Sequence, residues 1–220
     1  MKWVQISEHV WKCSIWMIIP VNVWLVRSDT GLTLVDAGIP SMAKGLLRQI
    51  DRLQMPLERI VLTHGHSDHV GSLKRILETY PVPVYAHETE IPYMEGSMPY
   101  PRRKKAEATV QPGIAAPLDM QNRIGGLMPY ATPGHSPGHT AYFHEQDRVL
   151  LAGDLFTSKR GQLNRPMPMF TADMKQAVES GAIVEQLAPK LVSVCHGGDV
   201  VITDPKQQVA AYRSISLARL

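Results

Sequence analysis

The chain has 220 residues, of which 44% are hydrophobic, and its formal net charge at neutral pH is only +3. This length allows a sizeable hydrophobic core. The small net charge excludes an attraction to nucleic acid or to membranes that is driven by charge alone. The two cysteines, Cys13 and Cys195, do not make a disulfide framework, so we expect a cytoplasmic protein.

The N-terminal part of the sequence predicts a meander of strands. Val10 to Ile19 and Val21 to Arg27 have strand-like patterns, and Ser28-Asp29-Thr30-Gly31 has the residues of a turn. A third strand, Leu32 to Val35, ends at Asp36-Ala37-Gly38. The polar start of the chain predicts no secretion signal, and the apolar run before residue 27 is interrupted and too short to span a bilayer.

Helices and strands alternate in the next part of the sequence. Ser41 is predicted to cap a helix from Met42 to Leu53, and a buried strand from Arg59 to Leu62 follows. The spacing of apolar residues then predicts a helix from Val70 to Tyr80 and a short strand from Val82 to Ala86.

The stretch from about residue 90 to 118 is rich in proline and has few periodic apolar residues. Long irregular segments in compact domains often carry function, so we expect a lid or a pocket wall here. The stretch contains Arg102-Arg103-Lys104-Lys105. This basic run is either a solvated surface or an attraction for an anionic substrate.

The C-terminal half predicts three strands and two helices. The strands are Thr140 to Glu145, Arg148 to Ala152 and Leu191 to Cys195, and the helices are Asp173 to Leu187 and Pro205 to Leu220. No repeat and no linker marks a boundary, so we expect a single domain over residues 1–220.

The densest concentration of reactive side chains is Thr63-His64-Gly65-His66-Ser67-Asp68-His69. It lies between the predicted strand and the predicted helix, on a loop that its glycine allows to turn tightly. Neutral imidazole and carboxylate are the ligands that zinc and similar ions prefer. A lone histidine is usually a surface or core residue, but this cluster indicates a metal site.

Further polar residues follow other predicted strands at or near the point where each strand ends. Loops at one edge of a sheet can converge on one point, and the sheet holds them rigidly. We therefore expect these residues to share one site with the histidine cluster: Asp36, His135, Asp154 and His196.

Five motifs together resemble the metallo-β-lactamase-fold hydrolase superfamily, in its lactonase and glyoxalase II-like branch. They are Leu34–Gly38, Thr63–His69, Thr132–His135, Gly153-Asp154 and Cys195–Gly197. The resemblance implies an α/β (α+β) fold, a four-layer αββα sandwich of two mixed β-sheets. It also implies a dinuclear metal site at one edge of the sandwich.

The resemblance assigns roles by position in the motifs. It implies a first metal held by His64, His66 and His135, a second held by Asp68, His69 and His196, and a bridge at Asp154. Asp36 would steady the ligands, and His139 would have a supporting role. The implied cofactors are two divalent ions, with Zn²⁺ preferred and iron or manganese as alternatives.

The implied reaction is hydrolysis of a small acyl substrate, a lactone, ester or thioester, by a hydroxide that bridges the two ions. Asp154 and Asp68 would be the catalytic residues, with Asp68 also a candidate proton shuttle. Thr157 stands where the lactonases carry a tyrosine, and only 24 residues follow His196, where glyoxalase II enzymes have a larger helical region. Trp16-Met17-Ile18-Ile19 would either line an acyl pocket or belong to the core.

Three alternatives stay open at this point. They are a glyoxalase II-like hydroxyacylglutathione hydrolase, a mononuclear iron dioxygenase of the persulfide type, and a non-catalytic binding module on the same fold. The expected partner is a small-molecule substrate, without nucleic acid or membrane, and a homodimer is left open.

Overall fold

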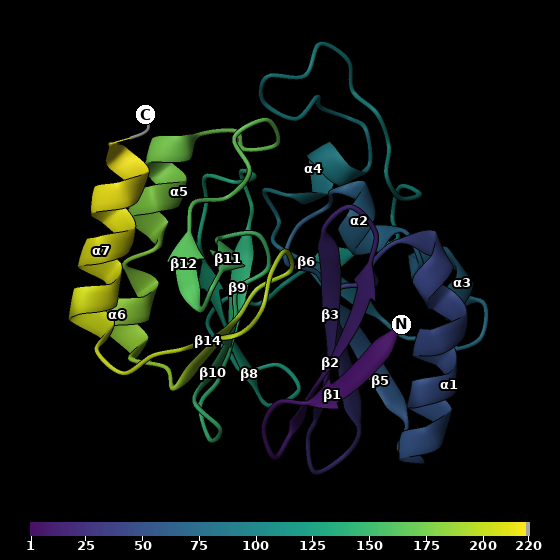
Figure 1. Cartoon of the computed structure of the whole chain (residues 1–220). Coiled ribbons are helices and arrows are strands. Elements are labelled where there is room, and N and C mark those ends of the chain that lie inside the picture. Colours follow the sequence, from purple (N-terminus) through teal and green to yellow (C-terminus); the bar gives the residue numbers. More distant parts are fainter. Residues whose placement is uncertain (219–220) are drawn as a thin grey trace.

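The computed structural model describes residues 1–218. Two mixed β-sheets face each other, and helices cover the outer face of each sheet (Figure 1). The expected αββα sandwich is therefore confirmed. Within residues 1–218, no helix is long and apolar enough to cross a membrane.

The first sheet has seven strands that are hydrogen-bonded in chain order, antiparallel from β1 to β4 and parallel from β4 to β7. The strands are β1 (Lys2–Gln5), β2 (Val10–Trp16), β3 (Pro20–Arg27), β4 (Leu32–Val35), β5 (Leu57–Val61), β6 (Val84–Ala86) and β7 (Ala116–Pro117). The helices of this half are α1 (Ala43–Leu53), α2 (Ser67–Val70), α3 (Leu73–Leu77) and α4 (Ile91–Met94). Strand β4 is buried along its whole length, including Thr33, the one polar residue among its four.

The second sheet has five strands in the order β14-β13-β10-β9-β8. The strands are β8 (Leu127–Ala131), β9 (Thr140–His144), β10 (Val149–Leu151), β13 (Leu191–Ser193) and β14 (Val200–Val201). A separate hairpin is formed by β11 (Thr157–Lys159) and β12 (Gln162–Asn164), and the helices are α5 (Met174–Ser180), α6 (Ile183–Leu187) and α7 (Pro205–Leu217). In this sheet β10 and β13 are the parallel pair, so the loops that follow these two strands begin at the same edge of the sheet.

Buried hydrogen bonds cross from one sheet to the other. The Tyr142 hydroxyl of β9 donates to the Leu62 carbonyl directly after β5, at 2.8 Å. The Trp24 Nε1–H of β3 donates to the Ser193 hydroxyl of β13, also at 2.8 Å. Because buried polar groups need partners, these pairs fix how the two sheets face each other.

Several local predictions are wrong at element boundaries. Ser41 does not cap α1, because a 3₁₀ turn over Pro40–Met42 precedes the helix and Met42 is its N-cap. The helix predicted over 70–80 is shortened to α3, because α2 occupies Ser67–Val70 and ends where that helix was expected to begin. The helix predicted over 173–187 is divided into α5 and α6. Strands β1, β7, β8, β11, β12 and β14 and helix α4 are not predicted from the sequence.

The turn between β2 and β3 is an exposed apolar tip. Trp16 is 75% exposed and Ile18 is 92% exposed, and Met17 is also exposed. These residues are therefore not part of the core. Because the carbonyl of the neighbouring Pro20 accepts from His196 Nδ1 at 2.9 Å, the tip lies beside the loop that carries His196.

Candidate metal centre

The candidate ligands come from both sheets and meet at one end of the sandwich. His64, His66, Asp68 and His69 lie on the β5–α2 loop and in α2. The β8–β9 loop supplies His135, and the loops after β10 and β13 supply Asp154 and His196. The strand-end positions seen in the sequence thus converge in space.

Three imidazoles form the first cluster. Nδ1 of His66 is 2.9 Å from Nε2 of His64 and 3.1 Å from Nε2 of His135. Nitrogens bound tetrahedrally to one zinc ion at 2.0–2.1 Å would be about 3.3 Å apart, so the spacing fits a shared ion. Burial lowers the pKa of His64 and His135 well below the usual value, which favours the neutral imidazole that binds metals.

The second cluster contains Asp68, His69 and His196. Nε2 of His196 is 3.2 Å from Oδ2 of Asp68, and the ligand-type atoms of the group lie within 4.8 Å of one another. The thiol of Cys195 belongs to the same group and is buried. The structure therefore places a sulfur atom at the site that the sequence did not assign to it.

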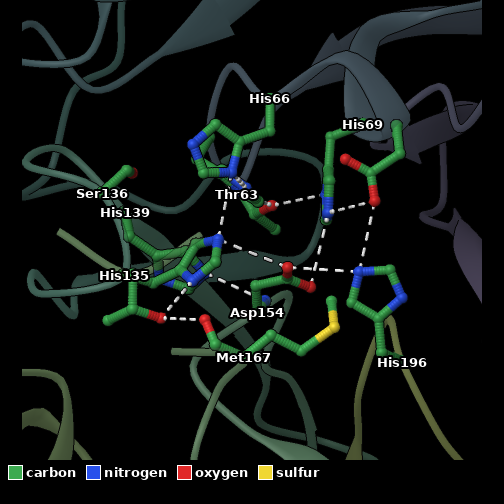
Figure 2. Close-up of polar contacts among 12 residues, drawn as sticks. Thr63, His66, His69, His135, Ser136, His139, Asp154, Met167 and His196 are labelled. Atoms are coloured by element: carbon green, nitrogen blue, oxygen red, sulfur yellow. Dashed lines mark hydrogen bonds and ion pairs between the residues drawn. The ribbon is translucent and has the colours of Figure 1, made fainter. Parts of the chain in front are cut away.

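The Asp154 carboxylate lies between the two clusters (Figure 2). Oδ2 is 3.3 Å from His135 Nε2 and 3.2 Å from His196 Nε2, and Oδ1 is 3.4 Å from His69 Nε2. Burial raises the pKa of Asp154, but His196 and His69 more than offset this and hold the pKa well below its usual range. Asp154 is thus an anion in contact with both clusters.

Three buried polar atoms of this site have no hydrogen-bond partner among the described residues: His69 Nε2, Asp154 Oδ1 and His196 Nε2. Leaving a buried polar atom without a partner costs about 1–3 kcal/mol. Three such atoms facing one point are explained if positive ions bind there. Imidazoles and carboxylates together suit zinc, iron or manganese, so the donor set fits metal ions.

Asp36 holds His69 in place, in the role that the family resemblance implies. Its buried carboxylate accepts from His69 Nδ1 at 2.7 Å and from the backbone N–H and the hydroxyl of Thr63, both at 2.8 Å. This fixes the proton on Nδ1 and turns Nε2 of His69 toward the site. Asp36 has φ +61°, a backbone conformation that aspartate tolerates better than most residues.

His139 supports Asp154 through the backbone. Its Nδ1 bonds the Thr132 hydroxyl at 2.8 Å, and its Nε2 accepts from the Asp154 N–H at 3.1 Å. Burial lowers the pKa of His139 to about 3, which keeps the ring neutral and able to accept. The contacts agree with the expected supporting role.

Glu90 is a residue of the site that the sequence did not reveal. It is fully buried. Oε1 accepts from the Gly65 N–H at 3.1 Å and the Tyr100 hydroxyl at 2.7 Å, and Oε2 accepts from the Ser136 hydroxyl and the Gly138 N–H, both at 2.8 Å. One carboxylate therefore joins the two histidine-bearing loops to the proline-rich stretch.

The glycine at position 138 allows Glu90 to approach so closely. A Cβ atom there would lie 2.6 Å from the Glu90 backbone nitrogen, which is closer than real Cβ contacts occur. A side chain at position 138 would therefore collide with Glu90, and this explains why glycine is found there.

Part of the proline-rich stretch lines a cavity beside the first cluster. The cavity is about 110 Å³ in volume and lies against His66 and His135. Tyr100–Arg103 form one wall and Met169–Ala172 form another. The stretch thus supplies a pocket wall, and whether it moves as a lid stays a prediction.

A separate group of histidine and aspartate side chains lies away from the candidate metal centre, at the opposite end of β2. It consists of His9, His144 and Asp147. His144 is buried, although an isolated histidine in the sequence would more often be a surface residue. Asp147 Oδ1 is 2.8 Å from His9 Nδ1, and the Asp147 N–H donates to His144 Nδ1 at 3.2 Å. Through these contacts the group holds the β1–β2 turn against the β9–β10 turn, which is a structural role.

The fold and the histidine-carboxylate site define a metallo-hydrolase, and comparisons with known proteins agree. A sequence profile of the metallo-beta-lactamase superfamily matches residues 17–196, and the chain belongs to this superfamily. The probable metallo-hydrolase YybB of Bacillus subtilis is 37% identical over 216 residues, 95% of this chain and 98% of that protein. A hydroxyacylglutathione hydrolase of Hahella chejuensis is 29% identical over 166 residues, 71% of this chain and 54% of that protein.

Solved structures support the same fold. The metallo-beta-lactamase family protein TTHA1429 from Thermus thermophilus has a TM-score of 0.76 at 21% identity, over 98% of this chain and 81% of that one. TTHA1623, solved in a di-iron-bound form, has a TM-score of 0.71 at 25% identity, over 90% of this chain and 97% of that one.

Proposed function

We propose that this protein is a dinuclear metallo-hydrolase that cleaves a small lactone, carboxylic ester or thioester. The observation that carries the proposal is the Asp154 carboxylate, which contacts both histidine clusters and has a buried oxygen that makes no hydrogen bond within residues 1–218. The first ion would be held by His64, His66 and His135, the second by Asp68, His69 and His196, with Asp154 between them. TTHA1623, which was solved with two irons bound, supports the dinuclear form.

Bound divalent ions supply a Lewis acid for a carbonyl oxygen and lower the pKa of water from 15.7 to about 7. The protein contributes the negative charge of Asp154 and a route for protons. The Asp68 side chain is 32% exposed, whereas that of Asp154 is 6% exposed. We infer that Asp68 exchanges protons between the site and solvent during turnover.

The surroundings of the site support an acyl substrate with an apolar part. The exposed tip of Trp16 and Ile18 lies beside the His196 loop, and Phe170 is 42% exposed at the wall of the cavity. Apolar side chains that remain exposed next to a polar site offer contact area to an apolar ligand. This favours a lactone or an ester with a hydrocarbon chain.

A glutathione thioester is the second candidate substrate. It is supported by the similarity to hydroxyacylglutathione hydrolases, among them GloC of Haemophilus influenzae, which is 28% identical over 68% of this chain and 76% of that protein. Metal-activated water suits esters and thioesters equally, so the metal centre does not choose between them.

We expect the purified protein to bind two transition-metal ions per chain. Elemental analysis after expression with added zinc, manganese or iron measures the stoichiometry. One tightly bound iron per chain, with no second ion under any loading, would instead favour the mononuclear dioxygenase.

We expect kcat/KM for an acyl-homoserine lactone or a simple aryl ester to exceed that for S-lactoylglutathione under one metal loading. The three values are compared on the same protein preparation. A preference for the thioester of more than about tenfold, which is about 1.4 kcal/mol of transition-state binding, would overturn the lactone-or-ester proposal in favour of the second candidate.

A further inference from the structure

We propose that the cavity beside the first histidine cluster is an anion subsite, in which Arg103 binds a carboxylate group carried by the acyl substrate. The proposal rests on the proposed hydrolase function and specifies the substrate class further. If the subsite binds a carboxylate in this way, the preferred substrate is an ester, lactone or thioester that also carries a carboxylate group near its reacting carbonyl.

The size and the lining of the cavity fit a small anionic group. A cavity of about 150 Å³ accommodates benzene, with six heavy atoms, so about 110 Å³ holds roughly four or five. A carboxylate with one or two attached carbons has this size. The lining contains two arginines and neither aspartate nor glutamate, so its charge favours an anion.

The backbone turn that presents Arg103 is held in place by its neighbour Arg102. The Arg103 N–H donates to the Tyr100 carbonyl at 2.9 Å, with Pro101 and Arg102 as the central residues of the turn. Arg102 has φ +68°, where glycine is favoured. Its Nη1 donates to the carbonyls of Pro168 and Thr171, both at 3.0 Å, and so fastens one wall of the cavity to the other.

Arg103 is the residue of the basic run that is left for a ligand. The guanidinium of Arg102 is engaged by two carbonyls, and Lys104 and Lys105 are not part of the cavity lining. Within the described part of the chain, the Arg103 side chain is exposed and has no ion pair and no hydrogen bond. A free guanidinium at a cavity wall matches a carboxylate, which it can bind through two parallel hydrogen bonds.

The test compares Arg103→Gln with Lys105→Gln, which removes the same charge from the same run outside the cavity. The two substrates are 4-nitrophenyl butyrate and mono-4-nitrophenyl succinate, which share a leaving group and differ in charge. We expect Arg103→Gln to reduce kcat/KM for the succinate ester about tenfold, mainly through KM, and to change the butyrate value less than twofold. Lys105→Gln should change both values less than twofold. Equal effects of Arg103→Gln on both esters would overturn the proposal.

A binding measurement separates failure of the subsite from failure of the proposed hydrolase. Titration calorimetry of succinate into the metal-loaded protein should give a Kd about tenfold weaker for Arg103→Gln than for the wild type and Lys105→Gln. Equal Kd values in the three proteins would overturn the subsite. If neither ester is cleaved by the wild type but the Kd values differ as expected, the subsite stands and the proposed hydrolysis is wrong.

Discussion

Replacing Asp154 with asparagine should reduce kcat/KM by at least about a hundredfold, the upper end of the loss expected for residues one layer further from a metal. Asp154 contacts His135 of one cluster and His69 and His196 of the other. Its carboxylate offsets positive charge between the clusters, and a neutral amide does not. The variant should also retain less metal, which elemental analysis after gel filtration measures.

A matched control for this prediction is Asp147→Asn. Asp147 is also a carboxylate between two histidines, but it lies at the opposite end of β2 from the candidate centre. We expect the control to keep its metal content and its kcat/KM. Near-normal activity and metal content in Asp154→Asn would mean that Asp154 has only a structural role.

Replacing Glu90 with glutamine should lower the free energy of unfolding by about 2–3 kcal/mol, because a buried donor is left without its acceptor. Each carboxylate oxygen of Glu90 accepts from one backbone N–H, Gly65 on one side and Gly138 on the other. The glutamine NH₂ group must face one of these N–H groups and cannot accept from it. Urea denaturation followed by circular dichroism measures the change.

The same substitution should weaken metal binding about tenfold, because Glu90 joins the loops that carry His64, His66 and His135. Glu95→Gln is the control, since the Glu95 carboxylate accepts from the exposed Gly113 N–H at 2.6 Å, which belongs to neither histidine-bearing loop. An unfolding free energy within about 0.5 kcal/mol of the wild type, with unchanged metal affinity, would show that the Glu90 contacts do not hold the site together.

The sequence predicted the features that depend on local patterns. Strands such as β4 are mostly apolar, with three apolar residues out of four, and the histidine motif of residues 63–69 follows a predicted strand directly. Because polar residues follow other strand ends in the same way, convergence on one site could be expected. The structure brings Asp154 and His196 to that motif, although they are far from it in sequence.

The role of Glu90 could not be read from the sequence, because it depends on contacts with Ser136 and Gly138, which are 46 and 48 residues away. A single glutamate in an irregular stretch has no periodicity that marks it as buried. The breaks in the predicted helices have a similar cause. Apolar spacing continues across Gly71-Ser72 and Gly181-Ala182, although the helices end there.

Each sheet is built from one continuous stretch of chain, residues 2–117 for the first and 127–201 for the second, and the candidate centre lies on the seam between them. During synthesis at about 5–20 residues per second, His196 would follow His69 by roughly 6–25 s. Over that interval the nascent first sheet would present His64, His66, Asp68 and His69 before His135, Asp154 and His196 complete the set. The complete metal site would then form only after the two sheets have packed against each other. Variants that slow this packing would therefore bind their metal ions later.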